Sequence, residues 1–405
     1  MTVVGKVNGS ASIGPASQQD MRRQNLAVVL GAVAAHSPLS RADVSGRVGL
    51  TRAAVSSLVD ELIARGMVTE AAATASGRPG RPGRALAVND AGPAGLGLEI
   101  GVGHLGACVV DLRGEPRVWR REERANAGRP AGEVLAETAA LAAEVQAEAA
   151  ALGLRVEGRV LAVPGVVPND PGGLVERAPN LGWRGVRLAD HWPDADTVPA
   201  PENEANLGAL AEYWSTGQHP ETFVHVSAET GIGAALVIDG GLFRGARGFA
   251  GELGHLPVHP DGPECACGAR GCLEQYAGET AVLRESGLAQ HHPGDVVALL
   301  AERAGAGHAP TLAALDRAGR ALGLALTSAV DLMDPDALVL GGAYAELADW
   351  LLPAVRTELA ARVTVRPWAP EALRPSALGR RGPLLGAALT TVRRIMADPT
   401  LLPVG

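Results

Sequence analysis

The chain has 405 residues, of which 47% are hydrophobic and 20% charged, a globular composition that suits two or three domains. It contains no apolar run of eighteen residues and no apolar N-terminal stretch, so we expect neither a helical membrane span nor a signal peptide. Lys6 is the only lysine among the 36 basic residues, which excludes sites that need a lysine in a folded domain, such as a P-loop or a Schiff base.

The net charge of −8 is divided unevenly along the chain. Residues 1–90 hold ten basic and six acidic side chains, whereas the rest of the chain holds 26 and 38. A basic end on an acidic chain indicates one module for an anionic partner and a larger module with another role. Three of the four cysteines lie within eight residues, which is not a secreted disulfide framework, so we expect a cytoplasmic protein.

Residues 21–90 have the pattern of a winged helix-turn-helix domain, preceded by a disordered lead at 1–20. A helical apolar face starts after Arg22. Ser40 and Thr51 stand at the N-cap positions of two further helices, which the turn at Gly49 separates. Strand-like residues 67–69 and 85–88 flank an arginine-rich Gly/Pro stretch. This order is the helix-turn-helix pattern, in which we expect the start of the third helix to meet base edges or phosphates of double-stranded DNA.

The candidate DNA contacts are short polar groups and arginines of this domain. Taken alone, the helices could form an ordinary helical bundle. The arginine stretch, taken alone, could be a flexible linker. Together with the local positive charge, the two parts favour DNA binding. The candidates are Arg41 on the second helix, Thr51, Arg52, Ser56 and Ser57 at the start of the third, and Arg78, Arg81 and Arg84 in the hairpin.

Beyond a short hinge at 90–93, the pattern changes to an internally duplicated α/β unit. A strand hairpin around Gly101-Val-Gly103 has a second copy 128 residues later (Ala107 to Ala235), in which Gly231-Ile-Gly233 is matched to the first glycine pair. Either pair could cradle phosphates or form a plain hairpin turn. The duplication predicts two similar lobes with a ligand cleft between them. The matched elements are strands 96–101, 106–112, 159–163 and 337–340 and helices 133–152 and 311–333.

A cluster of one histidine and three cysteines is the strongest chemical signal. His255, Cys265, Cys267 and Cys272 offer one imidazole and three thiolates, a closed tetrahedral set that favours a structural Zn²⁺. A disulfide or inert thiols are the alternatives, and a cytosolic setting and the clustering argue against them. Cys108 lies in an apolar strand and is predicted to be a core residue.

Carboxylates and amides surround this cluster and a second short segment. Glu252 and Glu274 flank the metal ligands, and Asn203, Glu204 and Asn206 precede a predicted helix. Such a set of donors and acceptors suits the hydroxyl groups of a sugar. Each of these residues alone could equally be a solvated loop residue.

Several motifs together resemble the ROK family (repressors, open reading frames and sugar kinases). They are Gly251-Glu-Leu-Gly-His255, Cys265-Ala-Cys-Gly-Ala-Arg-Gly-Cys-Leu-Glu274, Val163-Pro-Gly-Val-Val167, Ala178-Pro-Asn-Leu-Gly-Trp183 and Leu338-Val-Leu-Gly-Gly342. The resemblance covers roughly residues 95–396. With the helix-turn-helix in front, the whole chain resembles the NagC/XylR-type repressors of that family.

The resemblance implies a fold, a metal and a ligand. The fold is an actin-like (RNase H-like) two-lobe sugar-kinase fold over residues 95–405, with its cleft near residues 200 and 383. The metal is a structural zinc, and the ligand is a monosaccharide or a derivative. The implied sugar contacts are Asn203, Glu252, His255 and Glu274, with Asn180 and Gly165 on the opposite lobe.

Two departures from the family pattern bear on catalysis. Family kinases keep a catalytic aspartate at position 204, where this chain has Glu204, and a displacement of about 1 Å can cost about 10²-fold in rate. The first phosphate loop of the family usually reads Asp-x-Gly-Gly-Thr, whereas here it is Glu99-Ile-Gly-Val-Gly103. The second loop, Glu229-Thr-Gly-Ile-Gly233, is better kept. These departures argue against an enzyme.

We therefore predict a sugar-responsive regulator, most simply a repressor. It would act as a symmetric oligomer, a dimer or a tetramer, on a palindromic DNA operator, with Glu204 itself among the sugar ligands. One alternative is an active ATP-dependent ROK sugar kinase with a DNA-binding arm. The other is a regulator whose acidic domain responds to a protein partner instead of a sugar.

Overall fold

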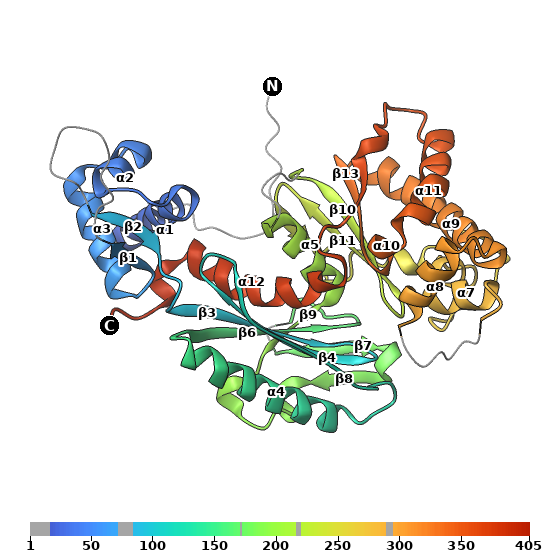
Figure 1. Ribbon diagram of the computed structural model, residues 1–405, viewed down its shortest axis with the longest axis horizontal. Helices are drawn as coiled ribbons and strands as arrows, with labels where there is room; N and C mark the ends of the chain where they lie inside the picture. The colour runs from blue at the N-terminus through green and yellow to red at the C-terminus, as the bar shows by residue number, and fades with distance from the viewer. Residues whose placement is uncertain (1–16, 72–83, 171, 216–219, 289–294) are drawn as a thin grey trace. The chain divides into compact units, whose positions relative to one another are not determined.

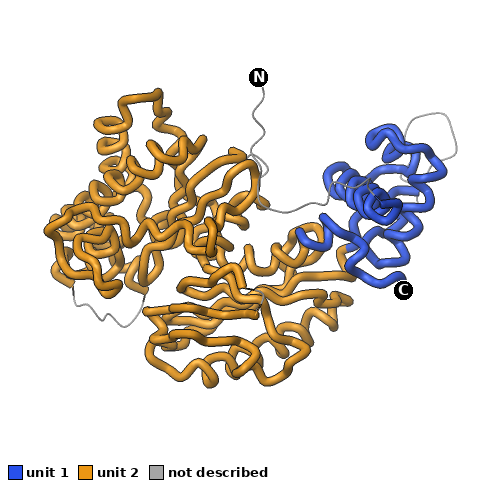
Figure 2. The backbone as a smooth tube through the Cα atoms, turned by 180° about the vertical axis from the view of Figure 1, so that it is seen from behind, with its two compact units in different colours: residues 1–89, 393–405 blue, residues 90–392 orange. Residues whose placement is uncertain are grey.

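The computed structural model describes residues 17–71, 84–170, 172–215, 220–288 and 295–405. Contacts divide the chain into two units, residues 1–89 with 393–405 and residues 90–392 (Figure 2). Among the described residues, no helix has the length and apolar character needed to cross a membrane.

In the described part of residues 17–89, the first unit consists of three helices and a strand pair. Ser40 and Thr51 cap the second and third helices, as predicted. The first helix begins at Gln18, inside the predicted lead, because the side chains of Ser17 and Asp20 accept hydrogen bonds from each other's backbone N–H groups. The two strands pair antiparallel. The elements are α1 (Gln18–His36), α2 (Arg41–Val48), α3 (Arg52–Ala64), β1 (Val68–Ala71) and β2 (Ala85–Val88).

The C-terminal segment, residues 393–405, belongs to this same unit and not to the larger domain in which we expected it. The guanidinium of Arg65 donates to the carbonyl oxygen of Leu402. The N–H of Gly405 donates to the carbonyl oxygen of Ala64 at 3.1 Å, and Leu402 is buried. These contacts attach the end of the chain to the end of α3.

The second unit has two lobes, each with its own five-stranded sheet and hydrophobic core. The sheet of the first lobe has the strand order β5-β4-β3-β6-β9, and α4 (Ala131–Ala151) and α12 (Gly382–Ala397) cover its two faces (Figure 1). Gly97 lets α12 pack directly on this sheet, because a Cβ there would lie 2.5 Å from the carbonyl oxygen of Leu384. The strands are β3 (Pro93–Ile100), β4 (His104–Asp111), β5 (Pro116–Glu123), β6 (Arg155–Val163) and β9 (Ala200–Asn203), with a separate pair, β7 (Leu174–Ala178) and β8 (Trp183–Arg187).

The sheet of the second lobe has the order β12-β11-β10-β13-β14. Helices α9 and α11 supply much of its core. The strands are β10 (Phe223–Ala228), β11 (Ile232–Ile238), β12 (Gly241–Phe243), β13 (Ala337–Gly342) and β14 (Leu373–Pro375). The helices are α5 (Glu204–Ser215), α6 (Glu274–Ala277), α7 (Glu279–Glu285), α8 (Val296–Gly305), α9 (Ala309–Met333), α10 (Ala343–Glu346) and α11 (Ala348–Arg362).

The two sheets confirm the duplication. In each, the first strand pairs antiparallel with the next one and parallel with the strand after the long helix. The match of the glycine pairs was wrong by two residues, because Gly233 lies within β11. The turn equivalent to 101–103 is 229–231, so Gly103 corresponds to Gly231 and Gly101 to Glu229.

The connection from β9 to α5 places the predicted sugar residues at the boundary of the lobes. Strand β9 is the edge of the first sheet and ends at Asn203. Helix α5 starts at the next residue, Glu204, and packs on β10 and β11 of the second sheet. The sequence therefore crosses from one lobe to the other at the Asn203–Glu204 step.

Candidate functional site

A cavity of about 630 Å³ lies between the two lobes. Both hairpin turns line it, through Gly101, Val102 and Gly103 on the first lobe and Glu229, Thr230 and Gly231 on the second. Asn180 and Glu204 line it as well. The predicted cleft is thus a real cavity, and two of the seven predicted sugar residues form part of its wall.

The polar atoms of the Asn203 side chain form hydrogen bonds with backbone groups around the start of α5 instead of facing the cavity. Its Oδ1 accepts from the backbone N–H groups of Ala205 at 2.9 Å and Asn206 at 3.1 Å. Its Nδ2 donates to the carbonyl oxygen of Gly165 at 2.7 Å. These bonds connect the two predicted residues Asn203 and Gly165 to each other and fix the backbone that carries Glu204.

Glu204 lies in a strongly acidic environment at the start of α5. Burial raises the pKa of its carboxyl to about 8, and repulsion from Glu229 and Glu99 adds to the shift. Burial also raises the pKa of Glu229 to about 7. Two adjacent carboxyl groups of the cavity wall are therefore largely or partly protonated near neutral pH.

Asn180 and Glu274 come together at Gly231, although they belong to different lobes. Asn180 lies on a short turn after β7, and Glu274 begins α6. A Cβ on Gly231 would lie 2.8 Å from Glu274 Oε2 and 3.1 Å from Asn180 Nδ2. Glu274 Oε2 also accepts from the N–H of Ile232 at 3.2 Å. The absence of a side chain at Gly231 thus lets a carboxylate and an amide from opposite lobes meet.

His255 connects Glu252 to the cysteine cluster. Its Nε2 lies 3.8 Å from Glu252 Oε2, and its Nδ1 lies 3.9 Å from Cys265 Sγ. Glu252 is about half exposed, with 47% of its side chain accessible. The Nδ1 side of the imidazole therefore points to the predicted metal ligands, and its Nε2 side points to Glu252, a predicted sugar contact.

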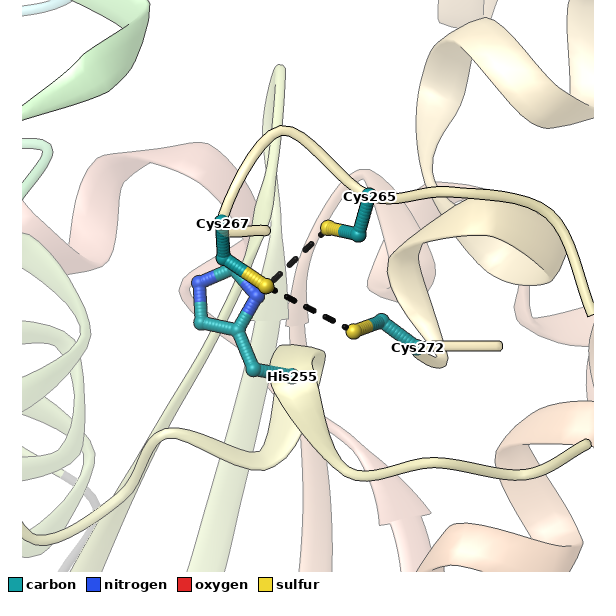
Figure 3. A group of neighbouring side chains, drawn as sticks. All are labelled: His255, Cys265, Cys267 and Cys272. Atoms are coloured by element: carbon teal, nitrogen blue, oxygen red, sulfur yellow. Dashed lines mark hydrogen bonds between the residues drawn. The ribbon is translucent and has the colours of Figure 1, made fainter. Parts of the chain in front are cut away.

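The four predicted metal ligands do converge (Figure 3). One ligand atom from each of His255, Cys265, Cys267 and Cys272 lies within 4.8 Å of the others. Cys267 Sγ is 3.7 Å from Cys272 Sγ. A tetrahedral ion with metal–sulfur bonds of about 2.3 Å requires sulfur atoms about 3.8 Å apart, so the spacing of the donors fits Zn²⁺.

Two arginines with notable contacts, Arg380 on the cavity wall and Arg244 beside the end of β9, were not predicted from the sequence. Arg244, which follows β12, forms an ion pair with the buried Glu202 at the end of β9. Arg380, just before α12, lies 3.2 Å from Glu346, 3.4 Å from Asp295 and 3.9 Å from Glu229. No local motif marks either arginine, because each partner is far away in the sequence.

The altered first loop has a specific structure. The imidazole of His104 covers Gly101, where a Cβ would lie 2.1 Å from the ring, and its Nε2 is 3.3 Å from a carboxylate oxygen of Glu99. The Asn126 amide donates to the carbonyl oxygens of Gly101 and His104. Glu99 is thus buried against a histidine of its own hairpin, 4% exposed.

The predicted DNA contacts divide into exposed and internally bonded groups. Arg52 and Ser57 are exposed on α3, and Arg84 is exposed just before β2, 3.4 Å from Glu70. Arg41 instead lies 2.7 Å from Asp60 and 2.8 Å from Glu70.

The remaining candidates take part in local bonds or are not described. Ser56 Oγ accepts from Arg41 at 2.9 Å, and Thr51 Oγ1 caps α3 by accepting from the N–H of Ala54. Arg78 and Arg81 lie outside the described residues.

Comparison with known protein families gives two matches along the chain. The model of the ROK family matches residues 95–393, and the model of the MarR family matches residues 27–79. The xylose repressor of Bacillus subtilis is 30% identical over 379 residues, which cover 92% of this chain and 95% of that protein.

Solved structures show the same two-part architecture and its kinase relatives. A ROK family transcriptional regulator, a homologue of the E. coli MLC protein, matches with a TM-score of 0.76 and 25% identity over 94% of this chain and 98% of the other. A ROK family glucokinase from Streptomyces griseus, in complex with glucose and AMPPNP, matches with a TM-score of 0.62 and 28% identity over 73% of this chain and 98% of the other.

Proposed function

Because this chain belongs to the ROK family, we propose that it is a sugar-responsive transcriptional repressor whose winged helix-turn-helix unit binds an operator and whose interlobe cavity binds a monosaccharide. The observation that carries this proposal is the similarity to a xylose repressor over 92% of this chain, covering both the DNA-binding segment and the sugar-kinase-like lobes. Sugar binding would release the protein from DNA.

The sugar would lie where the two lobes meet at Gly231. Asn180 on one lobe and Glu274 on the other would each bind hydroxyl groups of the sugar. A bound sugar would therefore influence the distance between the lobes. Glu204, Glu252 and His255 complete the proposed set. Asn203 and Gly165 act on the sugar through the backbone that they hold in place.

Phosphoryl transfer is disfavoured by the chemistry around Glu204. A general base must accept a proton, whereas a carboxyl with a pKa of about 8 is largely protonated at neutral pH. The longer side chain and the rearranged loop at Glu99 and His104 add to this argument. A coupled ATP assay with D-glucose and D-xylose should therefore give a turnover far below about 1 s⁻¹, the low end of ordinary enzymes.

We assign Zn²⁺ a structural role at His255 and the three cysteines. The ion would hold residues 255–272 as one loop and fix the imidazole that faces Glu252. The four ligands leave no coordination position open for substrate. A symmetric dimer or tetramer on a palindromic operator is part of the same proposal.

The proposal is tested by binding DNA and sugar together. In vitro selection from random duplexes identifies the operator, and electrophoretic mobility shift with the full chain then follows the effect of D-xylose and D-glucose. We expect one of these sugars to weaken operator binding at least tenfold. Operator binding that no member of a wider monosaccharide panel changes would contradict a sugar-responsive repressor.

A further inference from the structure

Ion pairs neutralise most arginines of the helix-turn-helix segment. Seven arginines lie in the described part of residues 17–89, and five of them have a carboxylate oxygen within 4.0 Å. Arg47 and Arg52 are exposed and have no such partner among the described residues. In this part of the chain, the unpaired positive charge is therefore concentrated at residues 47–52. The paired arginines are Arg22, Arg23, Arg41, Arg65 and Arg84.

Hydrogen bonds fix the turn that separates these two arginines. Gly49 ends α2 in the left-handed conformation, with φ 70°, and its N–H donates to the carbonyl oxygen of Ser45 at 3.2 Å. The hydroxyl of Ser45 donates to the carbonyl oxygen of Leu50 at 2.7 Å. The side chain of Thr51 then caps α3. Both guanidinium groups therefore extend from backbone positions that the turn holds in place.

The surface beside Arg47 carries no bulky side chains on its two nearest glycines. Gly46 and Gly49 are exposed, and a Cβ at either position would meet no atom within 4 Å outside its own segment. A nucleic-acid backbone can approach such a surface closely, because no side chain stands in its way at these positions.

The acid one helical turn before Arg47 does not neutralise it. Asp43 and Arg47 are four residues apart on α2, a spacing at which opposite charges on a helix can pair. The Asp43 carboxylate instead accepts from the backbone N–H of Ser40 at 3.0 Å and from its hydroxyl at 2.6 Å, in the capping box of α2. An external anion can therefore bind Arg47 without breaking an ion pair between described residues.

We propose that Arg47 contacts a phosphate group of the DNA backbone and contributes affinity without reading the base sequence. This inference rests on the proposed function, because it concerns the same operator-binding unit. In helix-turn-helix proteins the helix before the recognition helix crosses the DNA backbone, whereas the recognition helix meets the base edges. Arg47 lies in the last turn of α2, before the turn that leads to α3. A guanidinium there can donate two parallel hydrogen bonds to phosphate oxygens.

Fluorescence anisotropy of the full chain tests the proposal with two labelled duplexes, the selected operator and a random sequence of equal length. We expect Arg47→Gln to weaken binding to both duplexes by the same factor, about threefold or more, because a phosphate contact is independent of sequence. The slope of log Kd against log[KCl] should decrease by about 0.9 for each DNA-binding unit engaged. Arg47→Lys keeps the charge and should retain the wild-type slope.

Arg23→Gln is the matched control, since it removes the same charge from an arginine that is 47% exposed but paired with Asp20. It should leave both affinities and the salt slope unchanged. If Arg47→Gln does not fold, a second pair of variants carries the test. Gly46→Glu should weaken binding to both duplexes, whereas Gly31→Glu, at an equally open position of α1, should not.

The outcomes separate this inference from the proposed function. A folded Arg47→Gln protein with the affinity and salt slope of the wild type overturns the inference and leaves a sugar-responsive repressor intact. A loss of affinity for the operator alone assigns Arg47 to base recognition and likewise overturns the inference. Equal effects of Gly46→Glu and Gly31→Glu also contradict it. A wild-type chain that binds no duplex overturns both the inference and the proposed function.

Discussion

The buried carboxylate of Glu202 accepts hydrogen bonds from three directions, one of which is the Arg244 guanidinium of the other lobe. The other two donors are the backbone N–H of Asn203 at 2.9 Å and the Asn206 amide at 2.8 Å. Close by, the N–H of Asn169 donates to the carbonyl oxygen of Arg247 at 3.2 Å, again across the lobes. One ion pair thus joins the lobes beside the residues that shape the proposed sugar site.

Arg244→Met should loosen this junction. Removing the guanidinium leaves the buried Glu202 carboxylate without a charged partner, at a cost of about 2 kcal/mol. Hydrogen exchange of peptides containing Asn169 should then become faster. Arg247→Met is the control, because it keeps the backbone acceptor of that bond. Equal exchange in the wild type and Arg244→Met would show that the ion pair does not hold the lobes together.

Cys265→Ser or Cys267→Ser should remove the metal and the sugar response together. A tetrahedral site that loses one thiolate loses most of its affinity, and the loop from 255 to 272 then lacks its central restraint. Elemental analysis should find about one zinc per chain in the wild type and a loss in either variant. Cys108→Ala, in the core of β4, should keep the zinc. A variant without zinc that still responds to sugar would contradict the structural role.

Glu204 should make the protein less stable as pH rises. Its folded pKa of about 8 lies above the ordinary value of 4.5, so between these values the native state binds more protons than the unfolded state and stability falls with rising pH. In Glu204→Gln the fall in melting temperature from pH 5 to pH 8 should be smaller than in the wild type. Glu123→Gln should behave like the wild type. Parallel curves for all three proteins would refute the assigned environment of Glu204.

Arg52 and Arg41 should have separable roles in the DNA-binding unit. Arg52 is exposed, so Arg52→Ala should weaken operator binding about tenfold or more without changing the melting temperature. Arg41 bonds Asp60, Glu70 and Ser56, so Arg41→Ala should lower the melting temperature. Mobility shift and differential scanning fluorimetry measure the two effects. A stability loss confined to Arg52→Ala would reverse this assignment.

Leu402 should contribute to the stability of the helix-turn-helix unit. Its side chain is buried, and Leu402→Ala is expected to cost about 2–3 kcal/mol. Leu401→Ala is the matched control, because that neighbouring leucine is 45% exposed. Urea unfolding, monitored by the loss of operator binding, compares the two variants. Equal effects would mean that the C-terminal segment does not form part of this unit's core.

Local patterns in the sequence were sufficient for the elements and for the metal group. Capping residues such as Ser40 and Thr51 and the apolar face of α1 act within a few residues, so they can be recognised without the fold. The four predicted metal ligands lie within eighteen residues of one another and supply one imidazole and three thiolates, the donor types that structural zinc sites use. The duplicated lobes were visible because both copies keep the same order of strands and helices.

The tertiary structure decided how charges are distributed around the cavity. Glu229 approaches Glu204, and Arg380 approaches Glu346, only because the two lobes and the start of α12 converge. It also showed that residues 393–405 join the first unit and that the second turn is 229–231. Electrostatic interactions depend on distance and burial, which sequence separation does not encode. The sequence therefore determined the kinds of module and identified the group of one histidine and three cysteines that could hold a metal, whereas the fold determined which charges a ligand would meet.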